Sequence, residues 1–155
     1  MIIKSTKGQT NMNAIFLIIF IGLAGGIAVG LQSPMASMIT QRLGIFESVF
    51  IVHVGGALAA LIPLIVFGSR LREWRSVHWY TLGAGVFGLV VIAAISYMIP
   101  RVGVAASITT VVAGQLLVGT ILDQYGWLGA AVKPLDAARI LGLGVVLVGV
   151  WLTVK

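Results

Sequence analysis

The stretch AIFLIIFIGLAGGIAVGL, residues 14–31, contains no charged residue and is long enough to decide the fold class. A helix crosses the roughly 30 Å hydrocarbon core of a bilayer with about 20 apolar residues. Strands of a membrane barrel would be about half as long and would alternate in polarity. Four similar stretches follow, and the predicted spans are residues 13–39, 48–67, 79–99, 102–122 and 137–154. The sequence therefore predicts an all-α integral membrane protein, a bundle of five transmembrane helices.

The composition excludes a soluble globular protein. Of 155 residues, 59% are hydrophobic and only 9% are charged, whereas a soluble domain has about 25% charged residues. The net charge of +6 comes from cations between apolar stretches, which is typical of a multi-pass protein in a lipid bilayer and does not indicate a nucleic-acid partner. We expect residues 1–12 to form a flexible N-terminal extension and residues 13–155 to form a single transmembrane domain.

The distribution of cations bears on the orientation in the membrane. Five spans place the two termini on opposite sides, with seven Lys or Arg residues on the N-terminal side and three on the other. Cytoplasmic loops are enriched in Lys and Arg, so this count favours a cytoplasmic N-terminus. A chain starting at Met12 would lose Lys4 and Lys7, and the count of five against three would fix the orientation only weakly.

Polar residues inside the spans are the candidates for a functional site, because such groups are costly at membrane depth. Gln32, His53 and Gln115 are the strongest candidates, since Ser and Thr can bond to carbonyls of their own helix. Each of the three shares a helix face with Gly or Ala, and small residues favour close helix packing. We therefore predict that they point toward packed protein and line a pathway, which Tyr97 would cap. The competing interpretation is that they are interhelical hydrogen-bonding groups.

Depth in the membrane relates these residues to one another. Gln32 and His53 each lie about six residues, or roughly 9 Å, from the same membrane boundary. Gln115 lies about seven residues, or roughly 10 Å, from the opposite boundary. Pro34 is expected to disturb the first helix just before it. Asp123 ends the fourth predicted span, where the helix dipole disfavours an anion, so we expect it to pair with Arg139 or Lys133.

The sequence does not indicate an enzyme. It contains no cysteine, two histidines and four carboxylates, and these do not assemble a nucleophile with its base or a closed metal site. We therefore expect no catalytic residue, no metal and no cofactor.

Three segments carry a family resemblance. They are IPRVGVAASITTVVAGQLLVGTILDQYGWLG (residues 99–129), KPLDAARILGLGVVLVGVWL (residues 133–152) and GLQSPMASMITQRLG (residues 30–44). They resemble the small YdcZ-type inner-membrane family of the drug/metabolite transporter superfamily, most specifically in VAGQLL and in Leu122, Asp123 and Gly126. That family usually carries Asn four residues after the Gln, where this chain has Ala36. A polar role at this position is therefore not carried over.

The resemblance implies half of an inverted-repeat transporter. Full-length relatives contain two five-helix halves in inverted topology, with the substrate site between them. A single five-helix chain would complete that site as a homodimer, with an antiparallel pair favoured, or with a second half-transporter. The expected function is secondary transport or export of an unidentified small molecule by alternating access, in the cell inner (plasma) membrane.

Two other functions remain compatible with the sequence. One is a non-transporting membrane scaffold or accessory subunit, and the other is a flippase of the same fold for a lipid-linked substrate. The buried polar set separates the first of these from a transporter, because a scaffold does not need His53.

Overall fold

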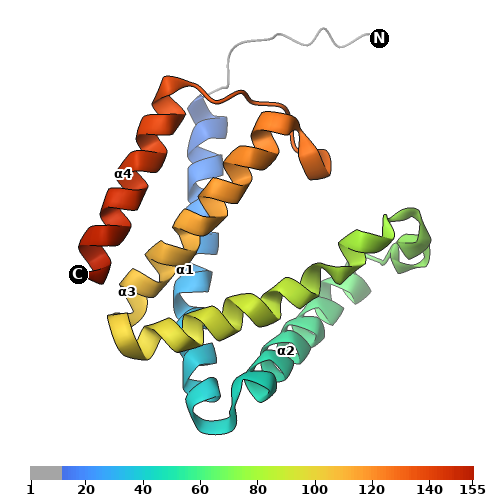
Figure 1. Ribbon diagram of the computed structural model, residues 1–155. Coiled ribbons are helices and arrows are strands. Elements are labelled where there is room, and N and C mark those ends of the chain that lie inside the picture. Colours follow the sequence, from blue (N-terminus) through green and yellow to red (C-terminus); the bar gives the residue numbers. More distant parts are fainter. Residues whose placement is uncertain (1–11) are drawn as a thin grey trace, which may run out of the picture. The chain divides into compact units, whose positions relative to one another are not determined.

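A computed structural model describes residues 12–155, and these residues are mostly helical with no strand among them (Figure 1). Four helices are long and apolar enough to cross a membrane: Ala14–Leu43, Ile45–Val66, Trp79–Tyr125 and Ala137–Val154. The prediction of an all-α membrane protein is therefore confirmed. The predicted N-terminal extension lies outside the described residues, except for Met12, which begins the first helix.

Helices α1 and α2 are separated by a single residue. Helix α1 (Met12–Leu43) is continuous through Pro34, so the predicted disturbance before this proline does not occur. Helix α2 (Ile45–Val66) begins directly after Gly44, whose φ of 115° lies in the region that favours glycine. The predicted spans left eight residues between the two helices, whereas the structure has only one. The positive φ of Gly44 lets this single residue turn the chain.

The third spanning stretch contains two of the predicted spans. The short 3₁₀ helix η1 (Leu71–Ser76) precedes this stretch, which begins with the 3₁₀ helix η2 (Trp79–Gly85) and continues into α3 (Val86–Tyr125). Helix α3 is broken at Gly103, where φ is 84° and ψ is 172°. The ribbon turns sharply there, in the yellow part of Figure 1, so the two parts of α3 run in different directions. The chain thus has four helices of spanning length among its described residues, and the third of them is broken.

The last helix is defined by its N-terminal cap. Helix α3 ends at Tyr125, and the next residue, Gly126, is in the left-handed conformation. The 3₁₀ helix η3 (Trp127–Gly129) follows. Helix α4 (Ala137–Val154) then begins after Asp136, whose Oδ1 accepts a hydrogen bond from the backbone N of Arg139 at 2.8 Å. A short polar side chain at this position satisfies a free backbone N–H of the first turn. The predicted bounds of this helix, residues 137–154, are confirmed.

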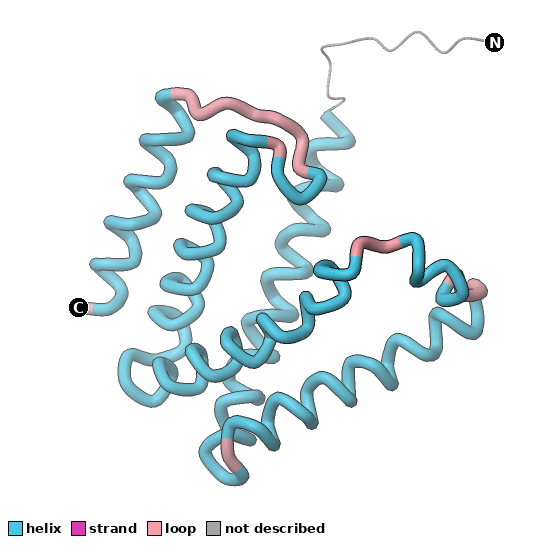
Figure 2. The backbone as a smooth tube through the Cα atoms, turned by 45° about the vertical axis from the view of Figure 1, so that its right-hand side comes forward, coloured by secondary structure: helices cyan, strands magenta, loops and turns pink. Residues whose placement is uncertain are grey.

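The chain divides into two compact units, Met1–Gln32 and Ser33–Lys155. In the second unit, α2 packs on α3 and the second part of α3 packs on α4, which run side by side in Figures 1 and 2. The buried residues of this unit are small or medium-sized, as is usual where membrane helices approach closely. They are Ser33, Ala36, Ser37, Ser48, Ile92, Ile95, Ser96, Ala106, Ser107 and Ala113.

Candidate functional site

Buried or half-buried hydroxyl side chains lie at the end of α1, at the start of α2 and in the middle of α3, and two of their hydrogen bonds join different helices. We call this group the serine junction, and its members are Ser37, Thr40, Ser48, Ser96 and Ser107. Ser48 Oγ donates to the carbonyl of Ala36 at 2.9 Å, and the hydroxyls of Thr40 and Ser96 lie 3.0 Å apart. Ser107 Oγ donates to the carbonyl of Gly103 at 2.6 Å.

The serine junction is completely hydrogen-bonded. Among the described residues, no buried side-chain nitrogen or oxygen lacks a partner. The sequence analysis set Ser and Thr aside as weaker candidates than Gln and His, and it did not identify the junction. Ser48 and Ser107 are 0% exposed, and a buried serine can donate its hydrogen bond to a nearby backbone carbonyl. Residue type alone therefore does not indicate that a serine is buried. We interpret the junction as the part of the chain that holds the helices together.

Gln32 is the last residue of the first unit and its side chain is exposed. The side chain forms no hydrogen bond with the described residues. Four residues on, Ala36 is 3% exposed and belongs to the packing of the second unit. The proximity of Gln32 and His53 that their depths indicate stays a prediction.

His53 lies on α2 against α3. Its Nδ1 is 2.7 Å from the carbonyl oxygen of Val49, one turn earlier, and its Nε2 faces Gly88 of α3 so closely that a Cβ at Gly88 would collide with it. A larger residue at position 88 would therefore displace the imidazole of His53. The side chain is nevertheless exposed at its edge, so the predicted packing is only partial within one chain.

Tyr97 is paired with a cation. Its ring lies 3.6 Å below the guanidinium carbon of Arg101, and Arg101 Nη1 also donates to the backbone carbonyl of Tyr97 at 2.6 Å. The tyrosine is 62% exposed. Its predicted role as a cap of the pathway stays a prediction.

Gln115 lines an open groove between the second part of α3 and α4. We call it the α3–α4 groove, and its volume is about 470 Å³. The side chain of Gln115 is exposed and forms no hydrogen bond with the described residues, so it is not an interhelical bonding group within this chain. The groove is lined by Gln115, Leu116, Gly119, Thr120, Asp123, Arg139, Gly142, Leu143 and Val146.

An ion pair forms one end of the α3–α4 groove. Arg139 Nη1 lies 3.4 Å from Asp123 Oδ2, and the two side chains are 34% and 38% exposed. The same Nη1 donates to the carbonyl of Lys133 at 3.1 Å. The predicted pairing of Asp123 with Arg139 is therefore confirmed, and Lys133 contributes backbone contacts rather than its ammonium group.

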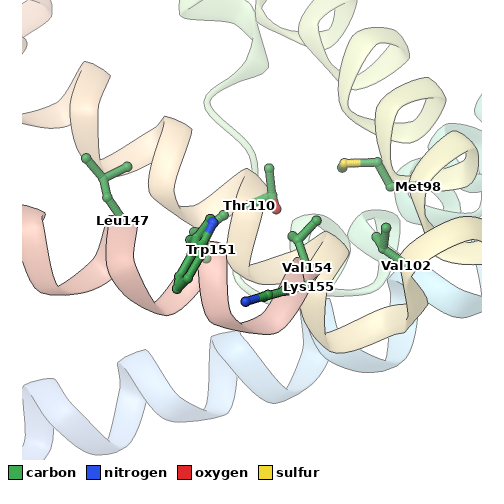
Figure 3. Close-up of a pocket in the computed structure, with 8 residues that line it drawn as sticks. Met98, Val102, Thr110, Leu147, Trp151, Val154 and Lys155 are labelled. Carbon is green, nitrogen blue, oxygen red and sulfur yellow. The ribbon is translucent and has the colours of Figure 1, made fainter.

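A second groove between α3 and α4 is mostly apolar (Figure 3). It has a volume of about 560 Å³ and is lined from α3 by Met98, Val102 and Thr110. From α4, Trp151 and Lys155 border it, with the Lys155 ammonium 4.8 Å from the centre of the Trp151 ring. Thr110 bonds to the carbonyl of Ala106 on its own helix. This groove presents mainly apolar and aromatic side chains. The ion pair and Gln115 line the α3–α4 groove instead.

No group of three or more His, Cys, Asp or Glu side chains is placed to hold a metal ion within residues 12–155. The expectation that the protein uses no metal or cofactor stays a prediction.

Comparisons with known proteins agree on one family. Residues 17–152 match the family described as "Putative inner membrane exporter, YdcZ". The chain is also 26% identical over 137 residues to the inner membrane protein YdcZ of Escherichia coli strain K12, which covers 86% of this chain and 91% of that protein. No solved structure matches the chain.

Proposed function

Because the chain belongs to the YdcZ family, we propose that it exports a small molecule across the inner membrane. The chain is a multi-pass inner-membrane protein, as its family and its four apolar helices establish. Its family is described by export and not by catalysis.

One observation carries the proposal: polar side chains that lie in the spans are left open by the chain itself. Gln32 and Gln115 form no side-chain hydrogen bond with the described residues, and His53 is bonded only to a carbonyl of its own helix. An unsatisfied polar group in lipid costs several kcal/mol. We therefore expect water, a substrate or a second subunit to form hydrogen bonds with these groups. A transport pathway contains water and substrate, and a dimer contributes the second subunit.

The break in α3 supports a five-span topology. Residues 79–102 and 104–125 each contain about the 20 residues that a helix needs to cross the bilayer. The non-helical Gly103 would then be the turn between the third and fourth spans. Such a chain is half of an inverted-repeat transporter and lacks the second half that would enclose its substrate site.

We propose that an antiparallel homodimer supplies the missing half and works by alternating access. By the bounds of the predicted spans, Gln115 lies roughly 10 Å from one boundary, and Gln32 and His53 lie roughly 9 Å from the other. Inverting one copy would therefore bring its Gln115 to the depth of His53 and Gln32 in the other. A chain starting at Met12 also has only a weak cation bias, which is compatible with insertion in both orientations.

The absence of native cysteine makes the orientation testable. A Lys155→Cys variant would be labelled in intact cells with a membrane-impermeant thiol reagent, before and after permeabilisation. Labelling of about half the protein before permeabilisation is the expected result for two orientations. Labelling of all or none of it would contradict the antiparallel dimer and leave a parallel dimer or a separate partner half.

The proposed export is tested by comparing the small molecules released by cells. Cells that produce the chain, cells that produce the His53→Ala variant and cells with the empty vector would be grown in parallel. We expect at least one compound to accumulate in the medium only with the unaltered chain, and the purified protein in liposomes to carry that compound. Identical media, with equal amounts of inserted protein, would instead favour a scaffold or accessory subunit.

A further inference from the structure

We infer that the α3–α4 groove binds a small zwitterion with an apolar remainder, whose carboxylate lies at Arg139 and whose ammonium lies at Asp123. This inference rests on the proposed export function and names the class of substrate that the groove accepts.

The ion pair has unused capacity on both partners. Arg139 meets Asp123 through a single contact of 3.4 Å between Nη1 and Oδ2, whereas a guanidinium has five N–H donors in a planar fork. Among the described residues, Nη2 and Nε of Arg139 and Oδ1 of Asp123 have no partner. A carboxylate can therefore bind the guanidinium in bidentate fashion while an ammonium binds the free carboxylate oxygen.

The pair is not required to hold the neighbouring loop. The backbone N of Lys133 donates to the carbonyl of Asp123 at 2.8 Å, and the backbone N of Leu135 donates to Gln124 Oε1 at 2.7 Å. Neither bond uses the carboxylate of Asp123 or the guanidinium of Arg139. The guanidinium also donates to the carbonyl of Lys133 through Nη1, and its Nη2 and Nε can bind a ligand while that bond is kept. The two charged groups can separate to receive a ligand while the loop keeps these contacts.

The paired charges select a ligand that carries both signs. A simple anion at Arg139 would leave Asp123 unpaired in a partly buried groove, and a simple cation at Asp123 would leave Arg139 unpaired. Because a bound ligand displaces the water that reaches these partly exposed side chains, a charge left uncompensated beneath it is unfavourable. A zwitterion replaces the internal ion pair with two new ones and leaves no charge alone.

The rest of the groove selects an apolar body. Leu116, Leu143 and Val146 line it, and Gly119 and Gly142 carry no side chain. A Cβ placed on either glycine would meet no atom within 4 Å, so the space above both is open. Gln115 lies eight residues from Asp123, about 12 Å along the helix, and limits the length of the ligand at the other end.

Radiolabelled L-leucine provides a direct test, with binding to the purified full-length protein measured by equilibrium dialysis. Competitors are 4-methylpentanoate, which lacks the ammonium, and 3-methylbutylamine, which lacks the carboxylate. We expect saturable leucine binding, and at least about tenfold weaker competition by each singly charged analogue, because each leaves one site charge unpaired. Competition by either analogue as strong as that by unlabelled leucine would overturn the inference.

Two glycine variants separate binding in the groove from a loss of folding. Gly142→Leu fills the groove and leaves Asp123 and Arg139 intact, whereas Gly144→Leu adds the same side chain to α4 outside the groove residues. Neither added Cβ meets an atom within 4 Å. We expect leucine affinity to fall at least about tenfold in the first variant and to stay within about twofold in the second. Equal affinities would show that leucine binds elsewhere.

The failure of this inference is distinguishable from the failure of the proposed export. If the medium comparison shows an exported compound but leucine, methionine and phenylalanine all fail to bind, the zwitterion site is wrong and export stands. If zwitterions bind but no compound is exported, the groove is a binding site and the proposed function is wrong.

Discussion

The serine junction and the α3–α4 groove are both polar regions of an apolar chain, and they treat their polar groups in opposite ways. At the junction, Ser48 and Ser107 are fully buried and each donates to a backbone carbonyl. In the groove, Gln115 is exposed without a side-chain partner, and the Asp123–Arg139 pair is about one-third exposed.

This difference distinguishes polar residues that stabilise the fold from polar residues that are available for function. Polar groups that the chain satisfies by itself stabilise helix contacts, because lipid cannot compete for their hydrogen bonds. Polar groups that the chain leaves open are costly unless something else binds them. We therefore expect substitutions at the junction to reduce stability, and substitutions at the open groups to reduce transport with little change in stability.

The largest loss of stability is expected for Ser48→Val. The substitution adds volume at a site with no exposed surface and removes the hydrogen bond to the carbonyl of Ala36. Overpacking and the lost bond together should cost about 3 kcal/mol. Thermal unfolding of the purified protein in detergent would measure the loss. An unchanged midpoint would show that the junction does not hold the helices together.

A somewhat smaller loss is expected for Gly103→Ala. The φ of 84° and ψ of 172° at this position are accessible essentially only to glycine, and other residues there cost about 2 kcal/mol. Gly114→Ala is the matched control, because Gly114 lies within α3 and a Cβ at either glycine meets no atom within 4 Å. If both variants unfold at the same temperature, the break in α3 is not a fixed feature of the fold.

Gly88→Ala should have a moderate effect that depends on His53. The new Cβ would collide with the imidazole and force it to move, at a cost of about 1 kcal/mol. Removing the ring as well, in the double variant His53→Ala with Gly88→Ala, should recover most of this loss. Additive effects of the two substitutions would mean that His53 and Gly88 do not touch.

The smallest change in stability is expected for Asp123→Asn in the groove. An exposed ion pair contributes about 0–1 kcal/mol, and this pair makes one long contact with both side chains about one-third exposed. Its removal should leave the unfolding midpoint nearly unchanged while export falls strongly. A loss of stability as large as that of Ser48→Val would erase the distinction between the two regions.

The sequence predicted the helices better than the turns between them. Length and apolar composition were sufficient for the spanning stretches, and the bounds of α4 were correct. The predicted turns, residues 40–47 and 100–101, contain or lie close to the observed ones. Their form was not predicted, because each depends on one glycine with positive φ, Gly44 or Gly103, and nothing in a chain with 20 glycines marks those two. Pro34 was misleading because a helix can continue through a proline when its neighbours accommodate the missing hydrogen bond.

The candidate site was predicted in part. Charge reasoning narrowed the partner of Asp123 to Arg139 or Lys133, and the structure has Arg139. The contact of His53 with Gly88 was not predicted, because it depends on how α2 packs on α3. The groove around Gln115 could not be predicted, because it depends on how α4 packs on the second part of α3. The serine junction was missed because residue type does not distinguish a hydroxyl bonded within one helix from one that joins two.

Export by variants of the open polar groups tests the central claim most directly. Release of the exported compound would be measured for His53→Ala and Gln32→Ala, with the amount of folded, inserted protein determined in the same cells. We predict that export is lost while the folded amount stays close to that of the unaltered chain, because neither side chain is fully packed within one chain. Normal export by both variants would contradict the claim that these groups line the pathway.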